Sequence, residues 1–186
     1  MTILACMLEE PSAKEMLKVV LPKILQDKIS VEYRIFQGKR DMEKHLFRIL
    51  RAWNTPDTHF LVLRDQDSGD CRIIKKDLAT LCRASGKTAW LVRIACRELE
   101  SFYLGDLVAV EKGLNLSGLA KMQENKRYRD PDRLGGPANE LTRLTKGLYQ
   151  KISGSRAIAP HLDLEKNKSH SFRILVDGIR NAFAAP

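Results

Sequence analysis

Apolar segments of two kinds alternate along the first half of the chain. Residues 2–8 are continuously apolar, as in a strand covered on both faces, whereas residues 29–36 alternate apolar with charged side chains, as in an edge strand. Two further apolar runs cover residues 60–64 and 88–96. Between these runs, apolar residues recur at helical spacing. Four strands joined by helices predict a mainly parallel α/β sheet with right-handed crossovers.

Proline and glycine mark the expected helix ends. Pro11 suits the first turn of a helix, and Pro22 is expected to kink or shorten that same helix. Gly86 follows the third helical stripe and is expected to end it. The second half of the chain lacks the strand and helix alternation. It predicts further helices, joined by a polar, turn-rich connection at residues 125–137.

Length and composition predict one globular body. The chain has 186 residues with no internal repeat or linker, so we expect a single domain of residues 1–186. Within it, residues 1–112 form the expected α/β core, and residues 113–186 form a helical and loop extension packed on that core. No apolar run is long enough to cross a bilayer.

The amino-terminal segment and the cysteines point to the cytoplasm. The first ten residues run from an apolar segment directly into acids, which is untypical of a signal peptide. The four cysteines have no Cys-x-x-Cys spacing, and Cys6 and Cys96 fall in expected strands, so free thiols are expected. A formal net charge of +9 favours polyanionic partners such as nucleic acid, although many basic proteins bind none.

Acidic residues follow the expected strands. Glu9 and Glu10 follow the first strand, and Asp65 and Asp67 follow the third. The carboxyl ends of parallel strands form the usual site of an open α/β sheet. Two aspartates one residue apart repel each other unless a cation is near, either a divalent metal ion or an arginine. Carboxylate oxygens are the ligands that Mg²⁺ or Mn²⁺ prefers.

The fourth strand also leads into acids, in the segment "RELESFYLGD". Glu98 and Glu100 compete as metal ligands, because residues two apart on a helix do not share a face. Both could equally be a solvated helix start, and an isolated Asp-x-Asp is common in loops. Asp70 and Glu15 are secondary candidates.

Five motifs resemble one known fold family. The segments "EEPSAKEML", "LVLRDQD", "ELESFYL", "KISGSRAIAPHLD" and "SFR" follow one another in the order seen in small bacterial Toprim-like proteins. These proteins are related to the overcoming-lysogenisation-defect nucleases, and the resemblance covers nearly the whole chain. It implies a Toprim-like sheet flanked by helices, with a helical C-terminal extension. Two positions depart from the family pattern: Glu10 replaces a usual glycine, and Ala13 replaces a usual acid.

The resemblance implies roles for the acids. Glu9 would be a metal ligand or general base, Asp65 and Asp67 would hold the principal Mg²⁺ or Mn²⁺ ion, and Glu100, or else Glu98, would be the third ligand. The implied reaction is phosphoryl transfer on nucleic acid, most simply hydrolysis of a phosphodiester. DNA is expected rather than RNA.

Cationic residues supply the complementary half of this hypothesis, since a phosphate must be held against the metal. Lys39 follows the second strand and could reach the site. Tyr128 could stack on a base. The remaining phosphate or nucleic-acid candidates are Arg156, His161, Arg173, Lys126, Arg127 and Arg129.

Two functions of different classes fit these features. The first is a metal-dependent cytoplasmic nuclease, which the relatives associate with defence against phage or plasmids. Because the sequence has no P-loop pattern, any ATP hydrolysis would come from a separate ATPase partner. A homodimer is also expected if both strands of a duplex are cut. The alternative is a noncatalytic adaptor or regulatory subunit that binds nucleic acid or the ATPase, with activity lost through Glu10 and Ala13.

Overall fold

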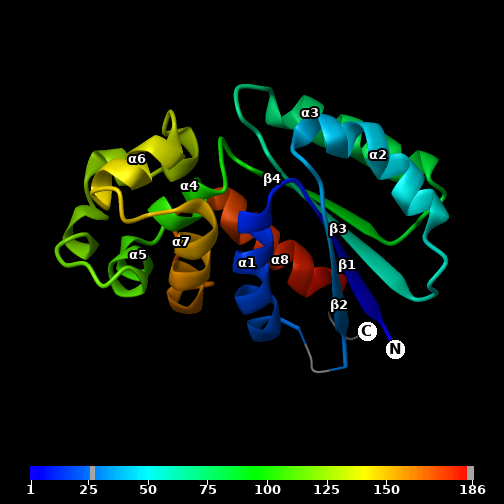
Figure 1. Ribbon diagram of the computed structural model, residues 1–186, viewed down its shortest axis with the longest axis horizontal. Helices are drawn as coiled ribbons and strands as arrows, with labels where there is room; N and C mark the ends of the chain where they lie inside the picture. The colour runs from blue at the N-terminus through cyan, green and yellow to red at the C-terminus, as the bar shows by residue number, and fades with distance from the viewer. Residues whose placement is uncertain (26–27, 184–186) are drawn as a thin grey trace.

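Four parallel strands form the only sheet in the computed structural model, which describes residues 1–25 and 28–183 (Figure 1). The strands are β1 (Ile3–Leu8), β2 (Ser30–Ile35), β3 (Thr58–Asp65) and β4 (Trp90–Ala95). Their order is β2-β1-β3-β4, and every pair is parallel. The predicted α/β class and the edge position of the alternating strand are therefore confirmed. All six residues of β1 are buried, as its apolar sequence predicts.

Helices cover both faces of the sheet. On one face lie α2 (Lys39–Ala52) and α3 (Cys71–Ala84), and on the other lie α1 (Pro11–Val20) and α8 (His170–Ala182) (Figure 1). Alternation along each strand divides the apolar side chains between these two layers, because successive residues point to opposite faces.

The helix ends expected from the sequence are present in the structure. Pro11 is the first residue of α1, and this helix ends at Val20, where a 3-10 turn (Leu21–Lys23) containing Pro22 follows. Gly86, with a φ of 80°, follows the end of α3. All four cysteines are free thiols; Cys6 is buried, whereas Cys96 lies just beyond β4 and is only half-buried.

The second half of the chain adds short helices beside the sheet (Figure 1). They are α4 (Glu100–Leu104), α5 (Leu107–Gly113), α6 (Pro137–Leu144) and α7 (Lys151–Ile158), with 3-10 turns at Ala120–Met122, Lys126–Tyr128, Pro131–Arg133 and Ala159–His161. The division of the domain at residue 112 stays a prediction. In the parts of the chain that the structure describes, no helix is long and apolar enough to cross a membrane.

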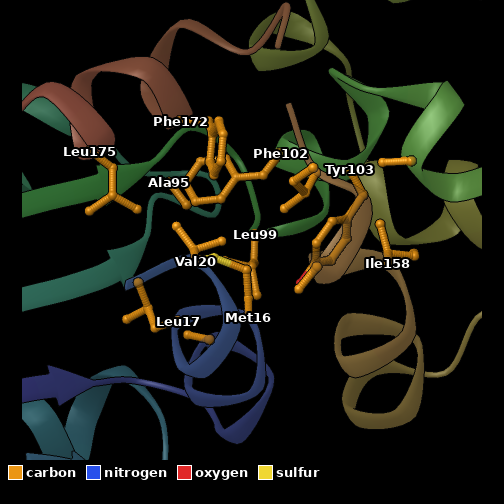
Figure 2. Close-up of a cluster of buried hydrophobic side chains, with 14 of the residues drawn as sticks. Met16, Leu17, Val20, Ala95, Leu99, Phe102, Tyr103, Ile158, Phe172 and Leu175 are labelled. Atoms are coloured by element: carbon orange, nitrogen blue, oxygen red, sulfur yellow. The ribbon is translucent and has the colours of Figure 1, made fainter. Parts of the chain in front are cut away.

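A core of apolar side chains joins α4 to the helices that cover one face of the sheet. Figure 2 shows Met16 of α1 together with Phe102 and Tyr103 of α4 and Phe172 of α8. The rings of Phe102 and Phe172 lie 5.2 Å apart between centroids. All four side chains are fully buried. Their burial fixes α4, whose first residue is a candidate metal ligand, against the helices of the sheet.

The contact between α5 and α7 leaves no room for a side chain at Gly113. A Cβ atom there would lie 2.6 Å from the carbonyl oxygen of Ala157 and 2.7 Å from the Cα of Ile158. We therefore expect Gly113→Ala to lower the free energy of unfolding by about 1 to 3 kcal/mol in urea titrations. Gly135→Ala is the matched control, because nothing lies within 4 Å of its Cβ position. Equal stability of both variants would contradict the close packing of α5 on α7.

Candidate active site

Three buried acids meet at the carboxyl edge of the sheet. Glu9 directly follows β1, Asp65 is the last residue of β3, and Glu100 begins α4 after β4. Glu9 is 8% exposed, Asp65 9% and Glu100 1%. The backbone N–H of Asp65 donates to Oε2 of Glu9 at 3.1 Å, which ties the ends of β1 and β3 together. The structure thus brings together acids that are widely separated in the sequence.

The acids at this edge point to two sides, because successive residues of a strand face opposite sides of the sheet. The first group, on the side of α2, contains Glu9 and Asp67. Nζ of Lys39, the first residue of α2, donates to Oδ2 of Asp67 at 2.7 Å. Asp67 adopts a left-handed backbone conformation, with a φ of 54°, and its N–H donates to the carbonyl of Arg97 at 2.7 Å. The protein cation beside Asp67 is therefore Lys39, the residue after the second strand that was expected to reach the site, and not an arginine.

The second group contains Asp65, Glu10 and Glu100. Nζ of Lys151, from α7, lies 2.9 and 3.1 Å from the two carboxylate oxygens of Glu10. The hydroxyl of Tyr149 donates to Oε1 of Glu100 at 2.8 Å. The other oxygen of Glu100, Oε2, is buried and has no hydrogen-bond partner among the described residues.

Burial and mutual repulsion strain these carboxylates. Burial raises the pKa of Asp65 well above its ordinary value, and the carboxylates of Glu100, Glu10 and Glu9 raise it further. Burial also raises the pKa of Glu9, against the hydrogen bond from the Asp65 amide, which lowers it. The pKa of Glu100 is raised by burial, although the Tyr149 hydroxyl partly offsets this. A cation placed among these acids would relieve both effects.

The donor chemistry fits a divalent metal ion. Carboxylate oxygens suit Mg²⁺ and Mn²⁺, and Oε2 of Glu100 is a buried acceptor that lacks a partner. Within residues 1–25 and 28–183, however, no group of three or more His, Cys, Asp or Glu side chains is arranged to hold a metal ion. The acids therefore suit a divalent ion by their chemistry, but the side chains of the described residues do not form a ready coordination shell.

Three further acids named from the sequence have structural partners. Oε2 of Glu98 accepts the N–H of Ala138 at 2.7 Å, at the start of α6. Asp70 is the N-cap of α3 and accepts two of its backbone N–H groups. Glu15 pairs with Arg156 at 2.7 Å, which links α1 to α7. Glu98 is therefore engaged at α6, while Glu100 lies beside Asp65.

Part of the basic loop at residues 126–129 is hydrogen-bonded to Glu140. This buried carboxylate accepts hydrogen bonds from the guanidinium groups of Arg127 and Arg143 and from the hydroxyl of Tyr128. Tyr128 is only 1% exposed, so the expectation that it stacks on a base was wrong. An aromatic residue in a basic loop suggested stacking, but its hydroxyl has a buried acceptor.

The other cationic candidates are spread over the surface. Lys126 and Arg173 are exposed, and Nε of Arg129 donates to the carbonyl of Glu124 at 2.8 Å. His161 lines a pocket with Asp106, Lys112 and Asp163, which does not include the acids at the carboxyl edge of the sheet. It lies ten residues beyond Lys151, about 15 Å along the helical segment, so it is not part of the acidic site.

Sequence reasoning missed three residues beside the acids: Lys151, Tyr149 and Arg64. Lys151 begins the segment "KISGSRAIAP", which the resemblance did mark, but nothing in that segment indicates a partner 141 positions away. Arg64 directly precedes Asp65 and lies 3.8 Å from Glu9 between Nε and Oε2.

Comparison with known proteins identifies relatives of the fold. Residues 8–180 match a family described as "Domain of unknown function (DUF4276)". The solved C-terminal region of the Burkholderia pseudomallei OLD protein superposes with a TM-score of 0.57 at 16% identity, covering 97% of this chain and 98% of that one. The corresponding region of the Xanthomonas campestris pv. campestris OLD protein has a TM-score of 0.54 at 13% identity, covering 97% and 95%. No curated protein matches the sequence.

At these identities the likeness establishes the fold alone. The sheet and its flanking helices match the Toprim-like fold of the OLD C-terminal regions, and the resemblance that the motifs indicated is confirmed.

Replacing the buried Asp65 by its neutral isostere should stabilise the metal-free protein. Since the folded-state pKa is raised, ionised Asp65 costs stability once the pH exceeds its ordinary value of 3.8. In chelator, we expect Asp65→Asn to raise the free energy of unfolding by about 1 to 2 kcal/mol at pH 7.5, and by less at pH 5. Urea titrations check this, with Glu32→Gln on the exposed edge as control. If Asp65→Asn were less stable than wild type at neutral pH, ionised Asp65 would not be destabilising at this edge of the sheet.

Glu140 should show the opposite pH dependence. The Arg143 and Arg127 guanidinium groups hold the pKa of Glu140 at about 2, below its ordinary 4.5. We expect Glu140→Gln to lower the free energy of unfolding by about 2 kcal/mol at pH 7. This is less than the lowered pKa of Glu140 alone implies, because solvent screens the exposed arginines. The difference from wild type should shrink as the pH falls from about 4.5 toward 2, as acid titration followed by circular dichroism would show. A difference that is independent of pH would rule out the ionic origin.

Proposed function

This chain belongs to the DUF4276 family, and we propose that it is a divalent-metal-dependent nuclease that hydrolyses phosphodiester bonds in nucleic acid. The observation that carries the proposal is the convergence of buried Glu9, Asp65 and Glu100 at the carboxyl edge of a Toprim-like sheet, with one oxygen of Glu100 unpartnered among the described residues.

The acids would hold the metal. Asp65 and Glu100 are the principal ligands of the proposal, with Glu9 and Asp67 completing the set from the other side of the edge. A bound Mg²⁺ or Mn²⁺ ion would polarise the phosphate and make a water molecule a better nucleophile. Glu9 would serve as a metal ligand or, with one carboxylate oxygen off the metal, as the general base that accepts a proton from that water.

The lysines would hold the substrate phosphate. Lys39 and Lys151 project from the first residues of α2 and α7 toward the two groups of acids. Each is about half-exposed, so it can leave its carboxylate for a phosphate oxygen when a metal ion takes over the acid.

A basic surface would hold the rest of the strand. The proposed contacts are Lys126, Arg127, Arg129, Arg156, His161 and Arg173, and the formal net charge of +9 supports a polyanionic partner. We take DNA as the substrate and the cytoplasm as the location. A separate ATPase partner, a role in defence against phage or plasmids, and a homodimer when both strands are cut complete the proposal, all by analogy with the Toprim-like relatives.

The second candidate is a noncatalytic adaptor of the same fold. The ion pair between Glu10 and Lys151 favours it, because Glu10 stands where the relatives have glycine and holds a cation beside the acids. In this function the basic surface would bind nucleic acid or the ATPase without cleavage.

Cleavage assays separate the two functions. Supercoiled plasmid, single-stranded DNA and RNA are incubated with Mg²⁺, Mn²⁺ or a chelator, using wild type, Asp65→Asn and Glu100→Gln. We expect metal-dependent cleavage that falls at least about 100-fold in both variants, since each removes a group acting at the reacting phosphate.

Glu32→Gln is the matched control, because it removes a carboxylate at the exposed edge of the sheet. Metal binding can be measured independently of cleavage: Mn²⁺ should raise the melting temperature of wild type but not that of Asp65→Asn. Cleavage that survives Asp65→Asn would refute the proposed site. Metal-independent DNA binding without cleavage would establish the adaptor.

A further inference from the structure

Arg64 places a positive charge inside the layer between the sheet and α2. It precedes Asp65 on β3 but points to the opposite face, where Ile74, Leu78 and Leu81 line the same groove. Its side chain is only 7% exposed. Removing a guanidinium from water is costly unless carboxylates compensate, so the partners of Arg64 indicate why it is there.

Two carboxylates flank the guanidinium. Nη1 donates to Oε1 of Glu43, on α2, at 2.6 Å, and Glu43 is about half-exposed. On the other side, Nε lies 3.8 Å from Oε2 of Glu9, within ion-pair range but too far for a hydrogen bond. Nε has no hydrogen-bond partner in the described part of the chain. Arg64 therefore connects an acid of the candidate site to an acid outside it.

One carboxylate oxygen of Glu9 has two neighbours on β3. The Oε2 atom accepts the N–H of Asp65 at 3.1 Å and lies 3.8 Å from Nε of Arg64, so two consecutive residues of β3 attract the same atom. The second oxygen, Oε1, has no such contact among the described residues. This arrangement leaves one oxygen of Glu9 for a ligand.

Helix α2 contacts this region at two points one turn apart. Lys39 and Glu43 are four residues apart and so lie on one face of the helix. Lys39 pairs with Asp67 and Glu43 pairs with Arg64. The first two turns of α2 therefore reach both Asp67 and Arg64, the two residues that lie beside Glu9.

We propose that Arg64 is a positioning residue for Glu9, and that Glu43 orients the guanidinium group of Arg64. Through this chain of contacts, a half-exposed acid on α2 determines how Glu9 presents its free oxygen. The inference adds a residue outside the acid cluster to the site and rests on the proposed function only for what Glu9 then binds.

The amide resonance of Asp65 reports the position of Glu9 without metal or substrate. We expect Glu43→Gln and Arg64→Lys to move the Asp65 ¹⁵N–¹H cross-peak toward its position in Glu9→Gln, because all three weaken the hydrogen bond to Oε2. Glu32→Gln is the control and should leave the cross-peak in place. An unchanged Asp65 cross-peak in folded Glu43→Gln would overturn the inference, even if Arg64→Lys fails to fold.

Metal affinity is the second readout. Titration of Mn²⁺ into the folded proteins should give an affinity about tenfold weaker for Glu43→Gln and Arg64→Lys than for wild type, as for other residues that orient a metal ligand. A purely structural Arg64 would lower the melting temperature but leave the affinity unchanged. If wild type binds no Mn²⁺, the metal chemistry of the proposed function fails, while the Asp65 cross-peak still decides the role of Arg64.

Discussion

Repulsion among buried carboxylates at one edge of the sheet is the constraint on which the rest of the structure depends. Parallel pairing of β1 and β3 brings Glu9 and Asp65 to the same edge, and α4 adds Glu100. Burial deprives these acids of the water that would normally disperse their charge. The surrounding elements therefore have to supply cations, or the fold has to carry the electrostatic cost.

Both responses are visible. Lysines at the first residues of α2 and α7 lie against the outer acids, Asp67 and Glu10, where water also has access. Asp65 and Glu100, the most enclosed acids, receive less compensation, and their pKa values rise. Such uncompensated strain is common where a protein binds an ion, because ligand binding then returns the energy that folding gave up.

The parts of the fold and site that could be predicted from the sequence are those set by residues close together in the chain. The positions of Glu9 and Asp65 were predictable, because each acid directly follows an apolar run and parallel strands share one carboxyl edge. The edge position of β2 was predictable from its alternating pattern, but the full order of the strands was not. The division of the acids into two groups was not, since it depends on the left-handed backbone at Asp67. Tyr128 was misread because the acceptor of its hydroxyl, Glu140, lies in a different helix. The role of Lys151 required knowing how α7 docks.

The docking of α7 on α1 also affects when the site can form. Lys151 meets Glu10, Arg156 meets Glu15, and the carbonyl of Pro160 accepts a hydrogen bond from Lys23, so the two helices are matched along their length. Each of these contacts joins residues more than 130 positions apart. During synthesis, the strands and their acids emerge from the ribosome well before α7 does. The nascent chain therefore carries an incomplete acidic edge until α7 has been synthesised and can dock on α1.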